Sequence, residues 1–286
     1  MRLKDSPFLK KISLQVGEKI IDFSTPKIMG VLNVTPDSFF DGGKNDSIEN
    51  AVNQAEKMIQ EGAEFIDVGG YSSRPGSDVV SIEEEINRTV SVVELIHEKF
   101  PSIFISIDTF RKQVAAENLK VGASWVNDIS AGNLDAEMIP WIKKYNIPYI
   151  AMHMRGNPQS MKGNCDYSNL TKEVMTELTS SLTELEPNHP LILDPGFGFS
   201  KTLDQNYELL NNLETFAKLN RPFLVGISRK SMIYNVLNIS PNEALNGTSV
   251  LNTIGILKGA SLLRVHDVKE AKEAIDLIIK LRGLEI

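Results

Sequence analysis

Short apolar runs alternate with amphipathic stretches along most of the chain. The apolar runs are rich in Val, Ile and Leu and occupy residues 28–34, 64–69, 103–108, 124–129, 147–153, 191–194, 223–227 and 261–265. They are almost wholly apolar, which is typical of strands buried on both faces of a parallel sheet. The pattern therefore predicts eight parallel strands.

The stretches between the runs have the period of helices. Over residues 51–59, and again over 82–96, the apolar positions fall on one helical face. Further helices are expected over 202–220 and 242–258. Before the first run, residues 10–24 alternate between apolar and polar with Gly17 at their centre, which predicts a β-hairpin.

Alternating strands and helices indicate an α/β fold with a parallel sheet. Eight such units in roughly 250 residues favour a closed TIM (β/α)8 barrel, here preceded by the N-terminal β-hairpin. An open doubly wound sheet is the alternative, but no Gly-x-Gly-x-x-Gly follows the first run. Since no linker or low-complexity tract divides the chain, residues 1–286 are expected to form a single domain.

Charge and composition narrow the classes of function. Lys and Arg number 30 and Asp and Glu 37, which gives a net charge of −7, and no basic cluster suggests nucleic acid. No apolar run approaches the ~18 residues that span a bilayer, and residues 1–5 are too charged for a signal peptide. The single cysteine, Cys165, cannot form an internal disulfide. We expect a cytoplasmic protein without membrane or nucleic-acid partners.

Polar residues end nearly every predicted strand. In a β/α barrel these ends form one rim, where the chemistry occurs. The rim residues are Asn33, Asp67, Asp108, Asn127, Asp128, Met152, His153, Asp194, Lys230, Arg264 and His266. Carboxylates in such apolar surroundings need partners, and a ligand rich in N–H donors could supply them. By contrast, Thr109, Ser130 and Asp267 are expected to be helix N-caps or turn formers.

Basic residues at the same rim indicate an anionic group on the ligand. They are Arg74, Lys230, Arg264 and His266. The planar fork of arginine is well matched to phosphate oxygens. Loops 33–43 and 70–76 are long and rich in small residues, as in loops that close over a substrate. Residues 228–231 begin a short helical segment, where a carboxylate could bind together with the Ser231 hydroxyl. No zinc, Walker or Gly-x-Ser-x-Gly motif is present.

Several segments at these strand ends match a known set of motifs. The main two are 29–43 (MGVLNVTPDSFFDGG) and 67–76 (DVGGYSSRPG). The others are 106–109, 126–129, 152–154, 193–199, 226–231 and 264–268. Together they resemble the dihydropteroate synthases, over about residues 25–275. The resemblance implies a barrel enzyme that joins a dihydropterin diphosphate to p-aminobenzoate and releases pyrophosphate.

The resemblance also implies three subsites. Pterin would be held by Asp108, Asn127, Met152, Asp194, Lys230 and Arg264. The diphosphate would be held by Asn33, Ser73, Arg74, Arg264 and His266, with Mg²⁺ near Asn33. Contacts to p-aminobenzoate would come from Phe39, Pro75, Phe199 and Ser231, where a sulfonamide that mimics it should compete. These assignments suit the chemistry, since a carboxylate accepts from the pterin's adjacent N–H donors and Mg²⁺ binds phosphates with few protein ligands.

The implied mechanism is loss of pyrophosphate from the hydroxymethyl carbon, followed by attack of the aniline nitrogen. The implied catalytic residues are Asp108, Lys230, Arg264 and His266. The cations and Mg²⁺ would stabilise the departing charge, and Asp108 a developing carbocation. The family further implies a homodimer, and we expect a monofunctional enzyme without an added pyrophosphokinase or aldolase domain.

The second loop departs from the family pattern, which commonly reads Gly-Glu-Ser-Thr-Arg-Pro-Gly. Here Tyr71 replaces the Glu, and Ser73 replaces the Thr but keeps a hydroxyl. We expect Tyr71 to pack in the closed loop without contacting substrate. Two alternatives stay open: a methyltetrahydrofolate-binding methyltransferase, against which Arg74 and the long loops argue, and a catalytically silent pterin-binding paralogue, against which Asn33 and Arg74 argue.

Overall fold

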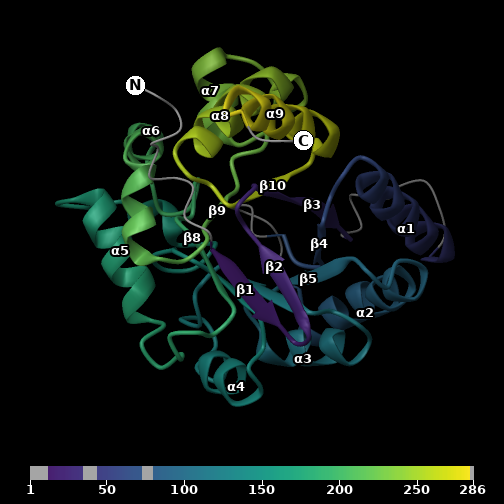
Figure 1. Ribbon diagram of the computed structural model, residues 1–286. Helices are drawn as coiled ribbons and strands as arrows, with labels where there is room; N and C mark the ends of the chain where they lie inside the picture. The colour runs from purple at the N-terminus through teal and green to yellow at the C-terminus, as the bar shows by residue number, and fades with distance from the viewer. Residues whose placement is uncertain (1–11, 35–43, 73–79, 284–286) are drawn as a thin grey trace.

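Eight parallel strands form the centre of the described part of the molecule, and helices surround them (Figure 1). The computed structural model describes residues 12–34, 44–72 and 80–283. The strands are β3 (Lys27–Asn33), β4 (Phe65–Gly69), β5 (Phe104–Asp108), β6 (Trp125–Asp128), β7 (Tyr149–Met152), β8 (Leu191–Asp194), β9 (Leu224–Val225) and β10 (Leu262–Val265). They match the eight predicted runs, with differences at their ends.

The sheet closes on itself. Its strands are hydrogen-bonded in the order β8-β7-β6-β5-β4-β3-β10-β9. Phe223, which precedes β9, forms a parallel bridge with Leu193 of β8, and Leu193 N donates to Pro222 O at 3.0 Å. These contacts join the first and last strands of that order. The predicted (β/α)8 barrel is therefore confirmed, and the open doubly wound sheet was the wrong alternative.

Nine α-helices lie within the described residues. They are α1 (Lys44–Gln60), α2 (Ile82–Lys99), α3 (Lys112–Lys120), α4 (Met138–Tyr145), α5 (Leu170–Ser180), α6 (Leu203–Asn211), α7 (Ser231–Leu237), α8 (Leu245–Leu257) and α9 (Val268–Leu281). Short 3-10 helices are η3 (Met161–Gly163), η4 (Leu213–Leu219) and η5 (Pro241–Glu243). Within these ranges, a search for helices that could cross a membrane finds none.

Two predicted helices are divided. The 202–220 helix changes from α6 to η4, where Lys258 Nζ donates to Asn211 O at 2.6 Å and Thr215 N bonds to Asn212 O. The lysine thus binds the Asn211 carbonyl oxygen, which would otherwise accept the next hydrogen bond of the α-helix. The 242–258 helix is divided because Ser240 and Glu243 form a capping box around η5, and α8 begins only at Leu245.

The predicted hairpin is confirmed as β1 (Ser13–Val16) and β2 (Lys19–Asp22). Gly17 has φ +59°, a conformation that a two-residue hairpin turn requires. In Figure 1 the hairpin lies across the ring of strands. Its Leu14 and Ile21 pack with an inner layer of barrel residues, namely Met29, Phe65, Trp125, Ile150, Ile192, Leu224 and Leu262. Because these residues lie toward the N-terminal ends of the strands, the hairpin covers that end of the barrel.

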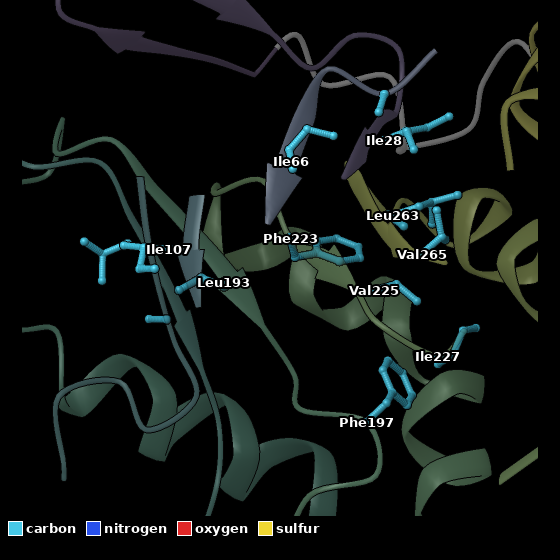
Figure 2. Close-up of a cluster of buried hydrophobic side chains, with 14 of the residues drawn as sticks. Ile28, Ile66, Ile107, Leu193, Phe197, Phe223, Val225, Ile227, Leu263 and Val265 are labelled. Atoms are coloured by element: carbon cyan, nitrogen blue, oxygen red, sulfur yellow. The ribbon is translucent and has the colours of Figure 1, made fainter. Parts of the chain in front are cut away.

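Alternate strand positions pack outward against the helices. Figure 2 shows part of this outer core, with Ile28, Ile66, Ile107, Leu193, Phe197, Phe223, Val225, Ile227, Leu263 and Val265 labelled. Since side chains alternate along a strand, the positions between them face the barrel interior. Moving toward the C-terminal ends, the interior changes from apolar to charged: Phe65 is followed by Asp67 on β4, and Leu262 by Arg264 on β10.

Candidate active site

Two acids and an amide surround one arginine at the C-terminal end of the barrel. Arg264 Nε donates to Asp67 Oδ2 at 2.6 Å, and Arg264 Nη2 donates to Asp108 Oδ2 at 2.6 Å. Asn127 Nδ2 donates to the same Asp67 oxygen at 2.9 Å. The predicted residues Asp108, Asn127 and Arg264 therefore lie together, although they come from three different strands.

Burial controls the charge of this cluster. It raises the pKa of Asp108 to about 7, with Asp67 adding to the rise and Arg264 opposing it. Burial opposes the charge of Arg264 too, but Asp67 and Asp108 raise its pKa overall. Asp67 is fully buried, and its Oδ1 has no hydrogen-bond partner among the described residues. The arrangement thus joins a permanent cation to acids that can still accept hydrogen bonds from a ligand.

Asp194 at the end of β8 and Lys230 just before α7 both bind the loop that follows β8. Asp194 Oδ1 accepts a hydrogen bond from Gly196 N at 2.7 Å. Lys230 Nζ donates to Phe197 O and lies 4.7 Å from the centre of the Phe199 ring. Burial lowers the pKa of Lys230 to about 8, against the effect of Asp194. Burial raises the pKa of Asp194, against the charge of Lys230.

Glycines leave room between these charged side chains. A Cβ at Gly69 would lie 3.5 Å from Asp108 Cβ and 3.7 Å from Asn33 Oδ1. Gly198 has φ +81°, and a Cβ there would lie 3.2 Å from Lys230 Cδ. Asn33 and Asp108 therefore lie close together next to Gly69, and Gly198 allows the Lys230 stem to pass the loop.

An apolar cluster lies beside the charged one. It contains Ile129, Met152, Met154 and Met161, with Phe110, Leu134 and Phe199 packed against it. The predicted ring contacts Met152 and Phe199 therefore belong to one surface. A charged cluster next to a sulfur-rich and aromatic surface suits a flat ring with polar edges.

The residues after β9 and β10 have mixed roles. His266 Nδ1 lies 3.0 Å from Ser228 Oγ, and Ser231 is an exposed residue at the start of α7. Asp267 stands at the N-cap position of α9 but makes no capping bond. Its carboxylate instead binds Arg229 through Nε at 2.9 Å and Nη2 at 2.8 Å. Asp267 thus stands at the predicted N-cap position but does not cap the helix through its side chain, because Arg229 binds the carboxylate.

Three other strand-end residues organise the turns after β5 and β6. Asp128 faces away from the barrel interior, and its carboxylate accepts from Ser130 N, Gly132 N and Tyr149 OH. Ser130 Oγ donates to Asp128 and accepts from Leu134 N. Thr109 Oγ1 accepts from Arg111 N at 3.2 Å. The turn-forming roles predicted for Thr109 and Ser130 are confirmed.

Tyr71 packs between loops. Its ring centre lies 5.3 Å from that of Phe110 in an edge arrangement, and Arg111 Cζ lies 5.2 Å from its ring centre. Gln159 Nε2 donates to Tyr71 OH at 3.1 Å. Tyr71 therefore joins the loops after β5 and β7, whereas its independence from substrate stays a prediction. The predicted residues Phe39, Ser73, Arg74 and Pro75 lie outside the described residues.

A buried network beside this site is not predicted by the sequence pattern. Lys201 Nζ lies 3.1 Å from His153 Nδ1, and His153 Nε2 lies 3.0 Å from Glu177 Oε2. His153 was recognised only as a strand-end residue. For Lys201, the available signal was its place directly after the 193–199 segment.

Outside the candidate site, a surface hollow and the possible metal ligands were the remaining features of interest. Between α5 and α6, an open hollow of about 630 Å³ is lined by Lys172, Glu208 and Lys218, and none of the site residues contributes to it. Across the residues that the structure describes, no three His, Cys, Asp or Glu side chains converge in a way that could hold a metal ion.

The chain is similar to a well-defined set of proteins. Residues 29–266 match the model of the pterin binding enzyme family. Dihydropteroate synthase from Escherichia coli is 44% identical over 266 residues, which cover 90% of this chain and 92% of that protein. The fold and these matches define a pterin-binding enzyme.

Solved structures agree. The Yersinia pestis dihydropteroate synthase in a sulfonamide drug complex has a TM-score of 0.88 at 36% identity, covering 95% of this chain and 100% of that one. The Xanthomonas albilineans dihydropteroate synthase with 4-aminobenzoic acid has a TM-score of 0.88 at 30% identity, covering 96% and 100%. The chain belongs to the dihydropteroate synthase family, a family of transferases.

Proposed function

We propose that this protein condenses 6-hydroxymethyl-7,8-dihydropterin diphosphate with p-aminobenzoate, giving 7,8-dihydropteroate and pyrophosphate for folate synthesis. The observation that carries the proposal is the gathering of Asp108, Asn127 and Arg264 at one end of the barrel, near Asp194 and Lys230. It is supported by the 4-aminobenzoic acid named in the structure of the Xanthomonas albilineans relative.

The pterin subsite would use the charged cluster and the apolar surface together. Asp194 would accept two N–H bonds from the amino-pyrimidine edge, and Lys230 would donate to the ring carbonyl. Asp108 and Asn127 would complete the polar edge. Met152 and Arg264 would lie against the two ring faces, since a guanidinium plane stacks well on a flat ring.

The diphosphate subsite would extend from Arg264 and His266 toward Asn33, Ser73 and Arg74. The position of Asn33 Oδ1 supports this, because it lies next to Gly69 and close to Asp108, which binds Arg264. An amide oxygen is a suitable ligand for Mg²⁺, which usually keeps waters and phosphate oxygens as its other ligands. We therefore propose Asn33 as a protein ligand of Mg²⁺, which when bound would neutralise charge on the leaving pyrophosphate.

The p-aminobenzoate subsite would be formed by Phe39, Pro75, Phe199 and Ser231. Lys230 Nζ lies 4.7 Å from the centre of the Phe199 ring, which supports a p-aminobenzoate subsite next to the pterin subsite. A sulfonamide that resembles p-aminobenzoate should then inhibit competitively, with an apparent inhibition constant that rises as p-aminobenzoate is raised. Inhibition that is independent of p-aminobenzoate would contradict this location.

The reaction would proceed by electrostatic stabilisation. The bond between the hydroxymethyl carbon and the bridging oxygen breaks, and its electron pair leaves with pyrophosphate. The aniline nitrogen then forms the new C–N bond and loses a proton. Arg264, Lys230 and His266 would stabilise the departing anion, while Asp108 would stabilise positive charge on the pterin. No protein nucleophile is needed.

The direct test compares the wild type with Lys230→Ala. The protein is incubated with the pterin diphosphate, labelled p-aminobenzoate and Mg²⁺, and both pyrophosphate and labelled dihydropteroate are followed. We expect equal amounts of the two products and a loss of roughly 100-fold in kcat/KM in the variant. Lys172→Ala, at an exposed lysine on α5, is the matched control and should retain activity.

The outcomes separate the candidates. Pterin binding without turnover in the wild type would favour a silent paralogue. Methyl transfer from methyltetrahydrofolate without pyrophosphate release would favour the methyltransferase. Wild-type turnover that is unchanged in Lys230→Ala would leave the synthase activity standing but remove Lys230 from the site.

We also propose that the protein is a homodimer. Helix α8 packs against α7 and α9 at the surface, yet residues 245–257 contain no charged side chain. A surface helix normally has a polar outer face. Exposed apolar residues also occur on these three helices, namely Val236, Leu237, Val250, Leu277 and Leu281. A second copy of the chain would cover them.

Two broader assignments complete the proposal. A cytoplasmic location is supported by the single, partly buried Cys165, since a reducing compartment requires no disulfide. A single domain spanning the chain is supported by one core cluster that runs from Ile28 on β3 to Ile279 on α9.

A further inference from the structure

Lys201 is a buried lysine whose charged form has a complete set of partners, although burial lowers its pKa to about 7 against the effect of Asp194. Its Nζ lies 3.0 Å from Gly196 O, 3.0 Å from Phe199 O and 3.1 Å from His153 Nδ1. An ammonium has three donors and no acceptor, so these three acceptors satisfy it fully. Lys201 itself lies in the loop between β8 and α6, and two of its acceptors are carbonyls of the same loop, so the lysine ties Gly196 and Phe199 together.

The histidine in this set must be neutral to accept from Lys201. Its other nitrogen, Nε2, then carries the proton and donates to Glu177 Oε2 at 3.0 Å. Burial, with the charge of Lys201 adding to its effect, lowers the pKa of His153 to about 4. Arg155 Nε donates to the same Glu177 oxygen at 2.9 Å, and the bonds from Arg155 lower the pKa of Glu177 to about 2. The chain Arg155–Glu177–His153 therefore presents a fixed acceptor to Lys201.

The loop held by Lys201 carries proposed substrate contacts. Phe199 is a proposed wall for p-aminobenzoate, and Asp194 at the loop's start is a proposed acceptor for the pterin. Lys230 also binds this loop, through Phe197 O. Because Lys230 is also proposed to donate to the pterin, its hold on the loop is tied to pterin binding. The hold of Lys201 does not depend on any proposed ligand.

We infer that Lys201 is a positioning residue that fixes Phe199 for p-aminobenzoate, with His153 and Glu177 orienting it. The inference rests on the proposed function for its substrate. Asp194 lies at the end of a strand held by neighbours on both sides, whereas Phe199 lies in the loop, where Lys201 binds its backbone carbonyl. Loss of Lys201 should thus affect p-aminobenzoate more than pterin.

The test measures kcat and both KM values for Lys201→Met. We expect the KM for p-aminobenzoate to rise roughly tenfold, with the KM for the pterin diphosphate and kcat each within about threefold of the wild type. Lys172→Met is the control and should match the wild type. His153→Leu should raise the same KM, and His153→Gln should raise it less because an amide can accept from Lys201 and donate to Glu177.

A second readout needs no turnover. In amide NMR spectra, Lys201→Met should shift and broaden the signals of Gly196 to Phe199, and Lys172→Met should not. Unchanged loop signals, or an equal rise in both KM values, would overturn the inference. If Lys201→Met fails to fold, the same comparison of the two KM values is made with His153→Leu and His153→Gln. A wild type without turnover would count against the proposed function alone, and the loop signals would then decide the inference.

Discussion

Asp108 shares the guanidinium of Arg264 with a second acid, Asp67, so its charge depends on pH near neutrality. Its pKa is raised to about 7, mainly by burial, and a pterin N–H requires the ionised form as acceptor. Dihydropterin affinity should therefore rise roughly eightfold between pH 6 and pH 7.5. Calorimetric titration across this range measures it. Asp108→Asn should bind with little pH dependence, and an equally steep dependence in that variant would assign the effect to another group.

The free energy of unfolding should also depend on pH, because His153 is neutral in the folded protein. Its pKa is lowered from 6.5 to about 4 in the folded protein, mainly by burial. Between these values the unfolded chain binds a proton that the folded one does not, so stability falls as pH falls from 6.5 to 4. The contribution lost by pH 4.5 is roughly 2–3 kcal/mol. Urea unfolding at pH 7 and 4.5 should show a smaller loss in His153→Gln, and an equal loss would exclude this histidine.

The sequence located individual site residues better than their contacts. Asp108, Asn127, Asp194 and Arg264 were predictable because each ends an apolar run. Their pairing was not, because it depends on which strands become neighbours and on the shear of the barrel. The role of Lys201 was also hidden, since its partners His153 and Phe199 meet it only in the folded loop.

At the scale of elements, the hairpin contributes stability at the end of the barrel opposite the site. On β2, Ile21 is buried and its neighbour Ile20 is 70% exposed. Ile21→Ala should lower the free energy of unfolding by about 2–5 kcal/mol through the cavity that it leaves. Ile20→Ala is the matched control and should change it by less than about 0.5 kcal/mol. Urea unfolding measures both, and a raised KM in Ile21→Ala would contradict the separation of hairpin and site.

The strands were predictable because a parallel barrel buries both faces of each strand, which produces continuous apolar runs. The ends of helices were less predictable. The change from α6 to η4 depends on Lys258, which reaches Asn211 O from another helix. The start of α8 is delayed by a local Ser240–Glu243 capping box, a signal that was present in the sequence but overlooked.

At the scale of the whole molecule, the proposed dimer follows from the uncharged helix α8 and the exposed apolar side chains on α7 and α9. Val250 on α8 is 50% exposed and Leu277 on α9 is 73% exposed, and burial of such side chains provides most of the driving force for association. Light scattering after size exclusion should give twice the chain mass of 31.8 kDa. The double variant Val250→Glu with Leu277→Glu should give the monomer, since each glutamate would lose its hydration on association. Tyr145→Glu, at an exposed aromatic residue on α4, should leave the dimer intact. A wild-type monomer would refute the proposal, and a double variant that remains dimeric would move the interface to another face.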